Sequence, residues 1–560
     1  MTTMRTFKAM VLTLIVSLWS VSYSYGQACY GAGSCQDFAN FGFNSTTAAT
    51  LEYDNYVSSF HSTVVRDLDG SLKIWGEKTK ADGTSSWLVP TPINAGNYPG
   101  LTGTPLKVAI GSFGINQVQF ALLTSDDKIF VWGAPGFLVS TALVSTANFQ
   151  QLSIGLPAGV TAANVKMFFG TNQAIILTTC GGDVYVLSPN TNMRTGLGSN
   201  TTWARIRKTD GSFLTNIVAA RGNSTGAIAL DGSGALWVWG FSWDGSTAVA
   251  NRNRATSLAL PAGATGSIKM IGATFGYNVD NYYPTYYILY TSGELYALGN
   301  NNYGQLGNWG TTNSATWVQP RYTSASGPVM TDIKWISPNE HDLGYGAINV
   351  LTNTKMIYAW GQESGNMLGR SGINGNLLVN PGVPGNFQPG YTNTNIIAVE
   401  SGGHTTMVLR ECNNTFGYVG HRTNGSMGDN VAISDYDPVY HFNTNAVAVC
   451  GAQTVSASIG TSYNGPYIVG NTLQLSGTPT GGTFSIDPST ASAATLSGNT
   501  LTFNTAGTVR VNYTVTAGSC GSVTIQKLFD VVNPASTFTL PGNIWNDANG
   551  NVATDGSEGG

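Results

Sequence analysis

Charged side chains are scarce in this chain. Lys and Arg number 25 and Asp and Glu 29 among 560 residues, so 10% of the sequence is charged, against about 25% in ordinary soluble proteins. Helical surfaces are usually covered by Glu and Lys, so this composition disfavours helices. The net charge is -4, and no run of Lys and Arg could neutralise a row of phosphates. Nucleic acid is therefore excluded as a partner.

Long apolar runs are also missing after the N-terminus. Residues 1–26 contain Arg5 and Lys8, then an apolar segment that begins at Ala9, then small residues up to Gly26. This order is typical of an export signal, and we expect cleavage after Gly26. No later stretch reaches about 18 uninterrupted apolar residues, so we expect no transmembrane segment in the mature chain. The sequence thus predicts an exported protein, extracellular or on the cell surface.

Cysteine occurs only six times. In an exported protein these residues can form disulfides. Cys29 and Cys35 are close enough in sequence for an N-terminal pair, and Cys450 and Cys520 bracket a candidate domain. The remaining two are Cys180 and Cys412. Each lies just before a turn of its repeat, and we interpret both as buried free thiols.

Local catalytic motifs are missing. The sequence has five histidines and contains no nucleophile elbow, paired zinc-ligand motif or phosphate-binding loop. The segment NEHD places Glu340, His341 and Asp342 in succession and is the only local cluster of acid–base groups. It precedes an apolar strand, so we interpret it as a turn and predict no catalytic residue.

Glycine, by contrast, is abundant, with 70 copies. Short strands with aromatic side chains recur, most of them ending in Trp-Gly or Leu-Gly. Before each strand lie two to four turn-forming residues and another apolar run, which is a hairpin pattern. Several copies offer a further strand upstream, so each repeat predicts a small antiparallel sheet of three or four strands. The repeated strands end at Gly76, Gly133, Ser188, Gly240, Gly299, Gly361 and Gly420.

A sheet of this size has two apolar faces and cannot bury them alone. When such sheets are arranged around an axis, each covers the faces of its neighbours. The regular spacing of the repeats therefore predicts an all-β fold, with a seven-bladed β-propeller over residues 27–449.

Two segments resemble a known family. NNNYGQLGN (300–308) and SGGHTTMVL (401–409) are similar to the regulator of chromosome condensation repeats, and the resemblance implies a seven-bladed propeller. Gly304 and Gly307 are expected to serve tight turns, and Leu306 to anchor the loop in the core. We expect His404, within the second segment, to serve structure between blades.

The repeat stops near Cys450. Short alternating segments with Gly, Asn and Pro turns fill residues 450–533 and predict a β-sandwich. The pattern resembles the immunoglobulin-like modules of bacterial surface proteins. Residues 534–560 form a predicted linker and a short polar C-terminal tail.

The tail contains a candidate calcium loop. Its oxygen-bearing residues follow the spacing of an EF-hand loop, although Val552 occupies the position where glycine is normally required. The stretch WNDANGN also resembles the start of the calcium-binding B repeats of bacterial surface adhesins. A flexible polar tail is the alternative. The candidate Ca2+ ligands are Asp547, Asn549, Asn551, Ala553, Asp555 and Glu558.

Four aromatic residues fall outside the repeat register and are candidates to face a ligand. They are Trp243, Trp309, Tyr282 and Tyr283. Rings on loops can stack on sugars or anchor a protein partner.

These features favour a non-enzymatic binding or adhesion protein that uses its inter-blade loops to bind an extracellular protein or glycan. The resembled family includes a secreted bacterial propeller that inhibits β-lactamase, so a soluble inhibitor is one form of this hypothesis. A polysaccharide hydrolase or lyase is the alternative, and would need carboxylates such as Glu340, Asp342 and Glu363 facing one another. Guanine nucleotide exchange is a remote alternative implied by the family.

Overall fold

The protein is described here from a computed structural model. The described residues are 56–67, 70–112, 116–195, 197–223, 225–244, 250–278, 281–340, 345–370, 377–410, 416–443, 447, 457–478, 480–516 and 522–534. Within them the chain is all-β, with two short 3-10 helices, η2 (Ala162–Asn164) and η3 (Pro488–Thr490). No helix in the described part is long and apolar enough to cross a membrane.

Residues 56–443 form seven four-stranded sheets in their described part, numbered here sheets 1 to 7 in chain order. Sheet 1 contains β1 (Tyr56–Ser59), β2 (Ser62–Arg66), β3 (Leu72–Gly76) and β4 (Trp87–Pro92), and sheet 2 contains β5 (Pro105–Ser112), β6 (Val118–Thr124), β7 (Ile129–Gly133) and β8 (Gln150–Gln151). Sheet 3 contains β9 (Val165–Gly170), β10 (Ile175–Thr179), β11 (Val184–Leu187) and β12 (Ala204–Arg205). Sheet 4 contains β13 (Ile217–Gly222), β14 (Gly226–Asp231), β15 (Leu236–Ser242) and β16 (Ala250–Leu258).

The remaining three sheets follow the same plan. They contain β17 (Ile268–Asn278), β18 (Asn281–Tyr290), β19 (Leu295–Gly299) and β20 (Ser314–Val318); β21 (Ile333–Pro338), β22 (Ala347–Thr352), β23 (Ile357–Glu363) and β24 (Leu377–Gly382); and β25 (Ile396–Ser401), β26 (Thr405–Arg410), β27 (Phe416–Arg422) and β28 (Asp435–Asn443). In six of the seven sheets the third strand ends at or runs through the glycine that closes the repeat in the sequence, and in sheet 3 β11 ends at Leu187, one residue before Ser188.

Every one of these sheets is an antiparallel meander of consecutive strands. The first and third strands therefore run in the same direction, and the connections that follow them lie at the same end of the sheet. We call this end the connector face. It contains the turn at residues 60–61 and the loop at 423–434, among others.

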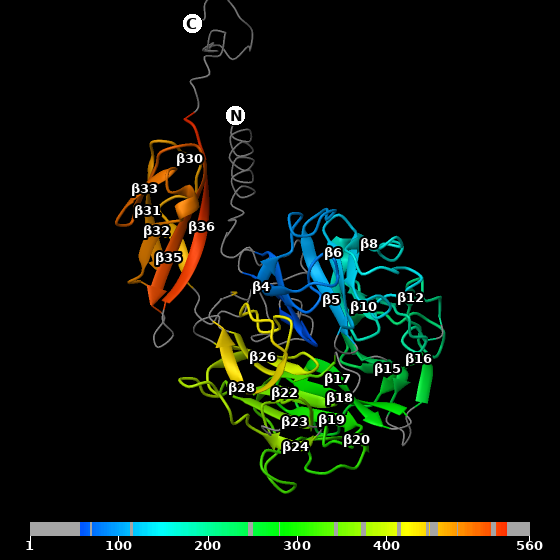
Figure 1. The fold of residues 1–560 in the computed structure, drawn as a ribbon. Helices are drawn as coiled ribbons and strands as arrows, with labels where there is room; N and C mark the ends of the chain where they lie inside the picture. The colour runs from blue at the N-terminus through cyan, green and yellow to red at the C-terminus, as the bar shows by residue number, and fades with distance from the viewer. Residues whose placement is uncertain are drawn as a thin grey trace, which may run out of the picture. The chain divides into compact units, whose positions relative to one another are not determined.

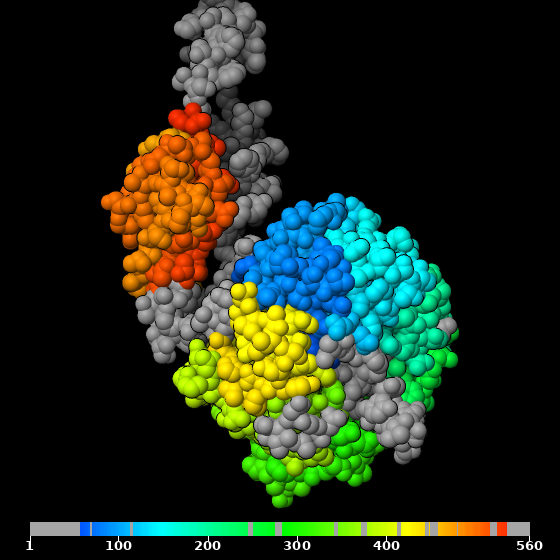
Figure 2. Space-filling view, in the orientation of Figure 1, coloured from blue at the N-terminus to red at the C-terminus, as the bar shows by residue number. Residues whose placement is uncertain are grey.

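The seven sheets form a closed ring. The first strand of each sheet contacts the first strand of the next, and β25 of sheet 7 contacts β1 of sheet 1. Figures 1 and 2 show the start of the described chain, in blue, against the last sheet of the ring, in yellow. The first strands therefore surround a common axis, which is the arrangement of a β-propeller.

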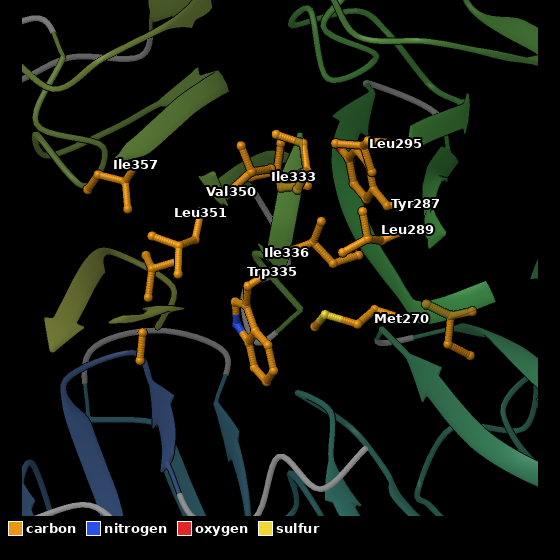
Figure 3. Close-up of a cluster of buried hydrophobic side chains, with 14 of the residues drawn as sticks. Met270, Tyr287, Leu289, Leu295, Ile333, Trp335, Ile336, Val350, Leu351 and Ile357 are labelled. Carbon is orange, nitrogen blue, oxygen red and sulfur yellow. The ribbon is translucent and has the colours of Figure 1, made fainter. Parts of the chain in front are cut away.

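Apolar side chains between neighbouring sheets hold the ring together. Figure 3 shows side chains of sheet 5, including Met270, Tyr287 and Leu289, directed toward Trp335 and Ile336 of sheet 6. All five side chains are buried. Burial of such a side chain stabilises a fold by about 1.5 to 3 kcal/mol, so each sheet depends on both neighbours for its stability.

The described residues in the ranges 457–516 and 522–534 belong to a second compact unit. Its two sheets have the strand orders β29-β31-β34-β33 and β30-β36-β35-β32, and both contribute to one buried apolar cluster. Buried and exposed residues alternate along β31 because one face of the sheet is covered. The unit is thus a β-sandwich. Its strands are β29 (Ser458–Thr461), β30 (Tyr467–Ile468), β31 (Thr472–Thr478), β32 (Thr483–Ile486), β33 (Ala494–Ser497), β34 (Thr500–Phe503), β35 (Gly507–Thr516) and β36 (Ser522–Val532).

Candidate functional site

A small cavity lies on the axis of the ring. The first strand of every sheet contributes to its wall, through Val57, Val108, Phe168, Arg221, Ile271, Ile336 and Glu400. Its volume is about 20 Å3, and a water molecule needs about 10 to 15 Å3 on this measure. The cavity therefore has room for a water molecule and none for a sugar ring.

Three charged side chains meet in this cavity. Arg221 and Glu340 are buried and Glu400 is partly buried. The Arg221 guanidinium lies 4.4 Å from the centre of the Phe169 ring. Glu340 Oε1 accepts the Ala273 amide at 2.9 Å. The arrangement places two carboxylates and one cation where water has little access.

Burial is the largest cause of the pKa shifts of Glu340 and Glu400. It raises the pKa of Glu340 to about 7, against the opposing effects of Arg221 and the Ala273 amide. Burial, followed by the charge of Glu340, raises the pKa of Glu400 to about 8, although Arg221 and the Ser337 hydroxyl oppose the shift. Near neutral pH the pair is therefore partly protonated.

A second polar cluster lies on the connector face, where sheet 1 meets sheet 7. His61 belongs to the two-residue turn between β1 and β2, His404 immediately precedes β26, and His421 lies near the end of β27. One nitrogen of each ring lies within 4.8 Å of those of the other two. His61 and His421 are buried, while His404 is partly exposed. We call these three residues the histidine cluster.

Aromatic rings surround the histidine cluster. The His404 ring centre lies 4.5 Å from that of Phe60 and 4.7 Å from that of Tyr345. The His421 ring stacks on Tyr436 with a centre separation of 4.4 Å. The expectation that His404 lies between neighbouring sheets is consistent with its contact with Phe60.

Glu77 orients one histidine of the cluster. Its Oε2 lies 2.9 Å from His61 Nδ1, and its Oε1 accepts the Asn116 amide at 2.5 Å. Glu77 is 1% exposed, and burial raises its pKa above the ordinary value while the Asn116 amide opposes the shift. With Nδ1 directed at Glu77, the His61 ring offers Nε2 to the cluster.

The repeat signature lies between neighbouring sheets. Gly307 has a φ of 65°, and Leu306 is fully buried. The carbonyl of Gln305 accepts the indole N–H of Trp360, on β23, at 2.9 Å. A Cβ at position 307 would lie 2.8 Å from that indole nitrogen. The loop between β19 and β20 of sheet 5 is therefore fitted against sheet 6, as expected for a structural segment.

The same contact recurs around the ring. Trp239 of sheet 4 donates its indole N–H to the Met193 carbonyl of sheet 3 at 3.2 Å. Trp75 of sheet 1 donates to the Ser426 carbonyl of sheet 7 at 3.1 Å. Tryptophans of the Trp-Gly pattern, on the third strands of sheets 1, 4 and 6, thus bond to the loop between the third and fourth strands of the preceding sheet in the ring.

The predicted ligand-facing aromatics have different environments. Trp243 is 5% exposed and donates its indole N–H to the Pro284 carbonyl at 3.0 Å, so the expectation that it faces a ligand is wrong. Trp309 is partly exposed, and its indole donates to the Arg321 carbonyl at 3.1 Å. Tyr283 is partly exposed, and the side chain of Tyr282 lies outside the described part.

The carboxylates considered for catalysis, Glu340, Asp342 and Glu363, are not brought together among the described residues. Glu340 lies with Glu400 in the axial cavity. Glu363 is fully buried, and its Oε1 accepts the amides of Leu368 and Arg370 at 3.3 Å each, so it stabilises its own loop. Asp342, like His341, lies outside the described residues.

The environment of Cys180 differs from the expected buried free thiol. It is exposed, at the turn after β10, and it takes part in a disulfide. The interpretation as a buried free thiol is wrong because the side chain at this turn faces solvent. Its partner lies outside the described residues, as do Cys29, Cys35, Cys450 and Cys520.

The export signal at 1–26 and the calcium-loop residues also lie outside the described part. For the loop these are Asp547, Asn549, Asn551, Ala553, Asp555 and Glu558.

The chain is similar to known proteins over part of its length. No family model matches the chain. The chain is 26% identical over 258 residues to the E3 ubiquitin-protein ligase HERC2 of Homo sapiens, covering 44% of this chain and 5% of HERC2. It is 25% identical over 307 residues to the ultraviolet-B receptor UVR8 of Arabidopsis thaliana, covering 54% of this chain and 62% of UVR8. The chain thus spans less than two thirds of the length of these curated relatives.

Solved structures with a similar arrangement include Prp20p of Saccharomyces cerevisiae, described with its binding to Gsp1p and histones. The TM-score is 0.47 and the identity 14%, over 70% of this chain and 88% of that chain. A structure of Kap60 bound to yeast RCC1 (Prp20) gives a TM-score of 0.48 at 14% identity, over 76% of this chain and 89% of that chain. The closed ring of four-stranded sheets makes the first unit a repeat β-propeller, and its sequence is similar to parts of HERC2 and UVR8.

Proposed function

We propose that the chain is an exported, non-enzymatic binding protein whose seven-bladed propeller holds an extracellular protein partner on its connector face. In this proposal each of the seven sheets is one blade, and the sandwich is an immunoglobulin-like spacer of a bacterial surface or secreted protein. A rigid ring with irregular connectors can present a binding surface without moving its core.

The observation that carries the proposal is the position of exposed apolar side chains. Leu378, Ile433 and Tyr436 are 39%, 44% and 41% exposed. All three lie where the third and fourth strands of sheets 6 and 7 are joined, so all three are at the connector face. Exposed aliphatic and aromatic side chains of this kind favour a protein partner. A glycan is the alternative ligand, and Tyr436 offers a ring on which a sugar could stack.

Polysaccharide cleavage has less support. A glycosidase needs two carboxylates on either side of the scissile bond, with room for the sugar. Glu340 and Glu400 share a cavity of about 20 Å3, and Glu363 accepts hydrogen bonds from its own loop. Nucleotide exchange on a cytosolic GTPase would conflict with the proposed export signal.

A comparison of surface variants tests the proposal. Wild-type chain is immobilised beside a Leu378→Ser/Ile433→Ser/Tyr436→Ala variant and a Leu260→Ser control, because Leu260 is also exposed but lies at the opposite end of its sheet. A purified partner identified by crosslinking from the extracellular fraction should bind wild type and control, and bind the triple variant at least about tenfold more weakly. Equal binding by all three proteins would overturn the connector-face assignment. Binding on a glycan array instead would replace the protein partner by a glycan.

Export is tested independently. The full chain expressed in a bacterial host should be recovered outside the cytoplasm with Gln27 as its first residue, measured by N-terminal sequencing. Recovery of the unprocessed chain in the cytoplasm would remove the export part of the proposal and leave the surface assignment intact.

We also propose that the C-terminal tail binds Ca2+. Asp547 and Glu558 stand at the first and last ligand positions of the EF-hand spacing. Calorimetric titration with Ca2+ should show binding that Asp547→Ala and Glu558→Ala remove. The absence of heat from the intact chain, or the same heat from both variants, would contradict this.

A further inference from the structure

The histidine cluster is assembled from distant parts of the chain. His61 comes from sheet 1, and His404 and His421 come from sheet 7. The cluster therefore exists only when the ring is closed. Phe60, beside His61 in the two-residue turn, has a φ of 52°, a conformation that a bulky side chain adopts at a cost of about 1 to 2 kcal/mol. Phe60 keeps this strained backbone conformation in the turn, and its ring packs against the His404 ring.

The cluster has the chemistry of a ligand set. His421 is 2% exposed, and its Nδ1 is buried and has no hydrogen-bond partner in the described part of the chain. Its Nε2 lies 3.4 Å from the Ser434 hydroxyl. An imidazole nitrogen without a hydrogen-bond partner can serve as a metal ligand.

Glu77 supplies a feature common around bound metals. Metal-binding histidines usually donate their second ring N–H to a carboxylate, which fixes the tautomer and the orientation of the ring. His61 Nδ1 and Glu77 Oε2 have this relationship at 2.9 Å, and the Asn116 amide fixes the other carboxylate oxygen. Glu77 is thus a positioning residue for His61.

We propose that His61, His404 and His421 bind a divalent transition-metal ion, with Zn2+ as the first candidate, and that the ion joins sheet 1 to sheet 7. Imidazole nitrogens suit Zn2+, Cu2+ and Ni2+ better than Ca2+ or Mg2+. In a tetrahedral zinc site with Zn–N bonds of about 2.0 to 2.1 Å, the nitrogens lie about 3.4 Å apart. The present separations, all within 4.8 Å, require each ring to move by roughly 1 Å.

The surroundings allow entry and a fourth ligand. His404 is partly exposed, so an ion can reach the cluster from solvent on that side. A water molecule or a group of a bound partner would complete four coordination. The rings of Phe60, Tyr345 and Tyr436 limit the access of bulk solvent. Because the site is complete only in the closed ring, metal binding stabilises closure.

Metal titration of the full chain tests the site. After treatment with chelator and desalting, the wild-type chain should bind Zn2+ with a Kd of about 1 µM or tighter, and bound Co2+ should give the visible absorption of a tetrahedral complex. His404→Ala should abolish the Co2+ spectrum. Glu77→Gln should weaken zinc binding by about 10- to 100-fold.

A matched control separates this site from other histidines. His441 lies in sheet 7, as His404 and His421 do, but its side chain is 40% exposed and its Nε2 lies 3.0 Å from Asp437 Oδ2. His441→Ala should therefore bind Zn2+ as wild type does. Circular dichroism verifies that each variant is folded. Zinc should raise the melting temperature of wild type and of His441→Ala but not of His404→Ala. Absence of binding by the wild type, or equal binding by His404→Ala, would overturn the proposal.

Discussion

Substitution of Gly307 by alanine should destabilise the propeller much more than the same change at Gly304. Both glycines belong to the repeat signature and both have positive φ, 65° and 75° respectively. The left-handed conformation alone costs an alanine about 1 to 2 kcal/mol. At Gly304 the new Cβ would lie 3.5 Å from Leu378, an ordinary contact, so this conformational cost is the expected total.

At Gly307 two further costs arise. The new Cβ would lie 2.8 Å from Trp360 Nε1 and 2.9 Å from Pro320 Cβ. Overpacking of this kind costs about 1 to 3 kcal/mol. Displacement of the indole would also break its bond to the Gln305 carbonyl, at about 1 kcal/mol. We therefore expect Gly307→Ala to lower the free energy of unfolding by about 2 to 4 kcal/mol more than Gly304→Ala does.

Urea unfolding followed by tryptophan fluorescence measures this difference, because buried tryptophans lie throughout the ring. Far-UV circular dichroism should give the same transition midpoint for each variant. Equal losses at the two positions would refute the reasoning, since they would show that the loop is not fitted against sheet 6. A Gly307→Ala variant as stable as wild type would do the same.

Three further predictions concern other parts of the chain. Burial raises the pKa values of Glu340 and Glu400 from 4.5 to about 7 and about 8. Their contribution to stability is fully present below the unfolded pKa and is lost as pH rises through the folded values, so propeller stability should fall from about pH 4.5 to about pH 8, and Glu400→Gln should flatten the profile. Trp360→Phe should lower the free energy of unfolding by about 1 kcal/mol more than Trp132→Phe does, as measured by urea unfolding. The reason is that the Trp360 indole donates a hydrogen bond to the Gln305 carbonyl, whereas the Trp132 indole N–H has no hydrogen-bond partner among the described residues. Equal losses would show that the Trp360 bond contributes nothing to stability. Gly477→Ala should lower the melting transition of the sandwich and leave that of the propeller unchanged in calorimetry, because a Cβ there would lie 1.9 Å from the Tyr513 ring; a shift of both transitions would show that the two units unfold together.

The repeating strands could be predicted because their signal is local. An apolar run, a short turn and a strand that mostly ends in Trp-Gly or Leu-Gly recur along the sequence, and this local pattern predicts the positions of the third strands to within one residue. The fourth strands were harder. β8 (Gln150–Gln151) and β12 (Ala204–Arg205) have two residues each, which is too short for an alternating pattern to be visible.

The polar clusters could not be predicted, because ring closure creates them. Glu340 was grouped with its sequence neighbours, whereas its partner in the axial cavity is Glu400 on the next sheet. His61 and His421 lie on the first and last sheets and have no motif in common. Trp243 stood outside the repeat register and was expected to face a ligand, but its indole finds a carbonyl partner on β18.

In the described part of the chain, sheets 1 and 7 are each made from consecutive strands, so among these residues no strand is shared across the place where the ring closes. Side-chain packing and single contacts such as that of Trp75 with Ser426 must hold this junction. As the chain emerges during synthesis, sheet 1 has to wait for tens of seconds, at about 5 to 20 residues per second, before its last neighbour exists. Until then one apolar flank stays open to chaperones and to aggregation, and a chain cut short before sheet 7 would keep that flank open.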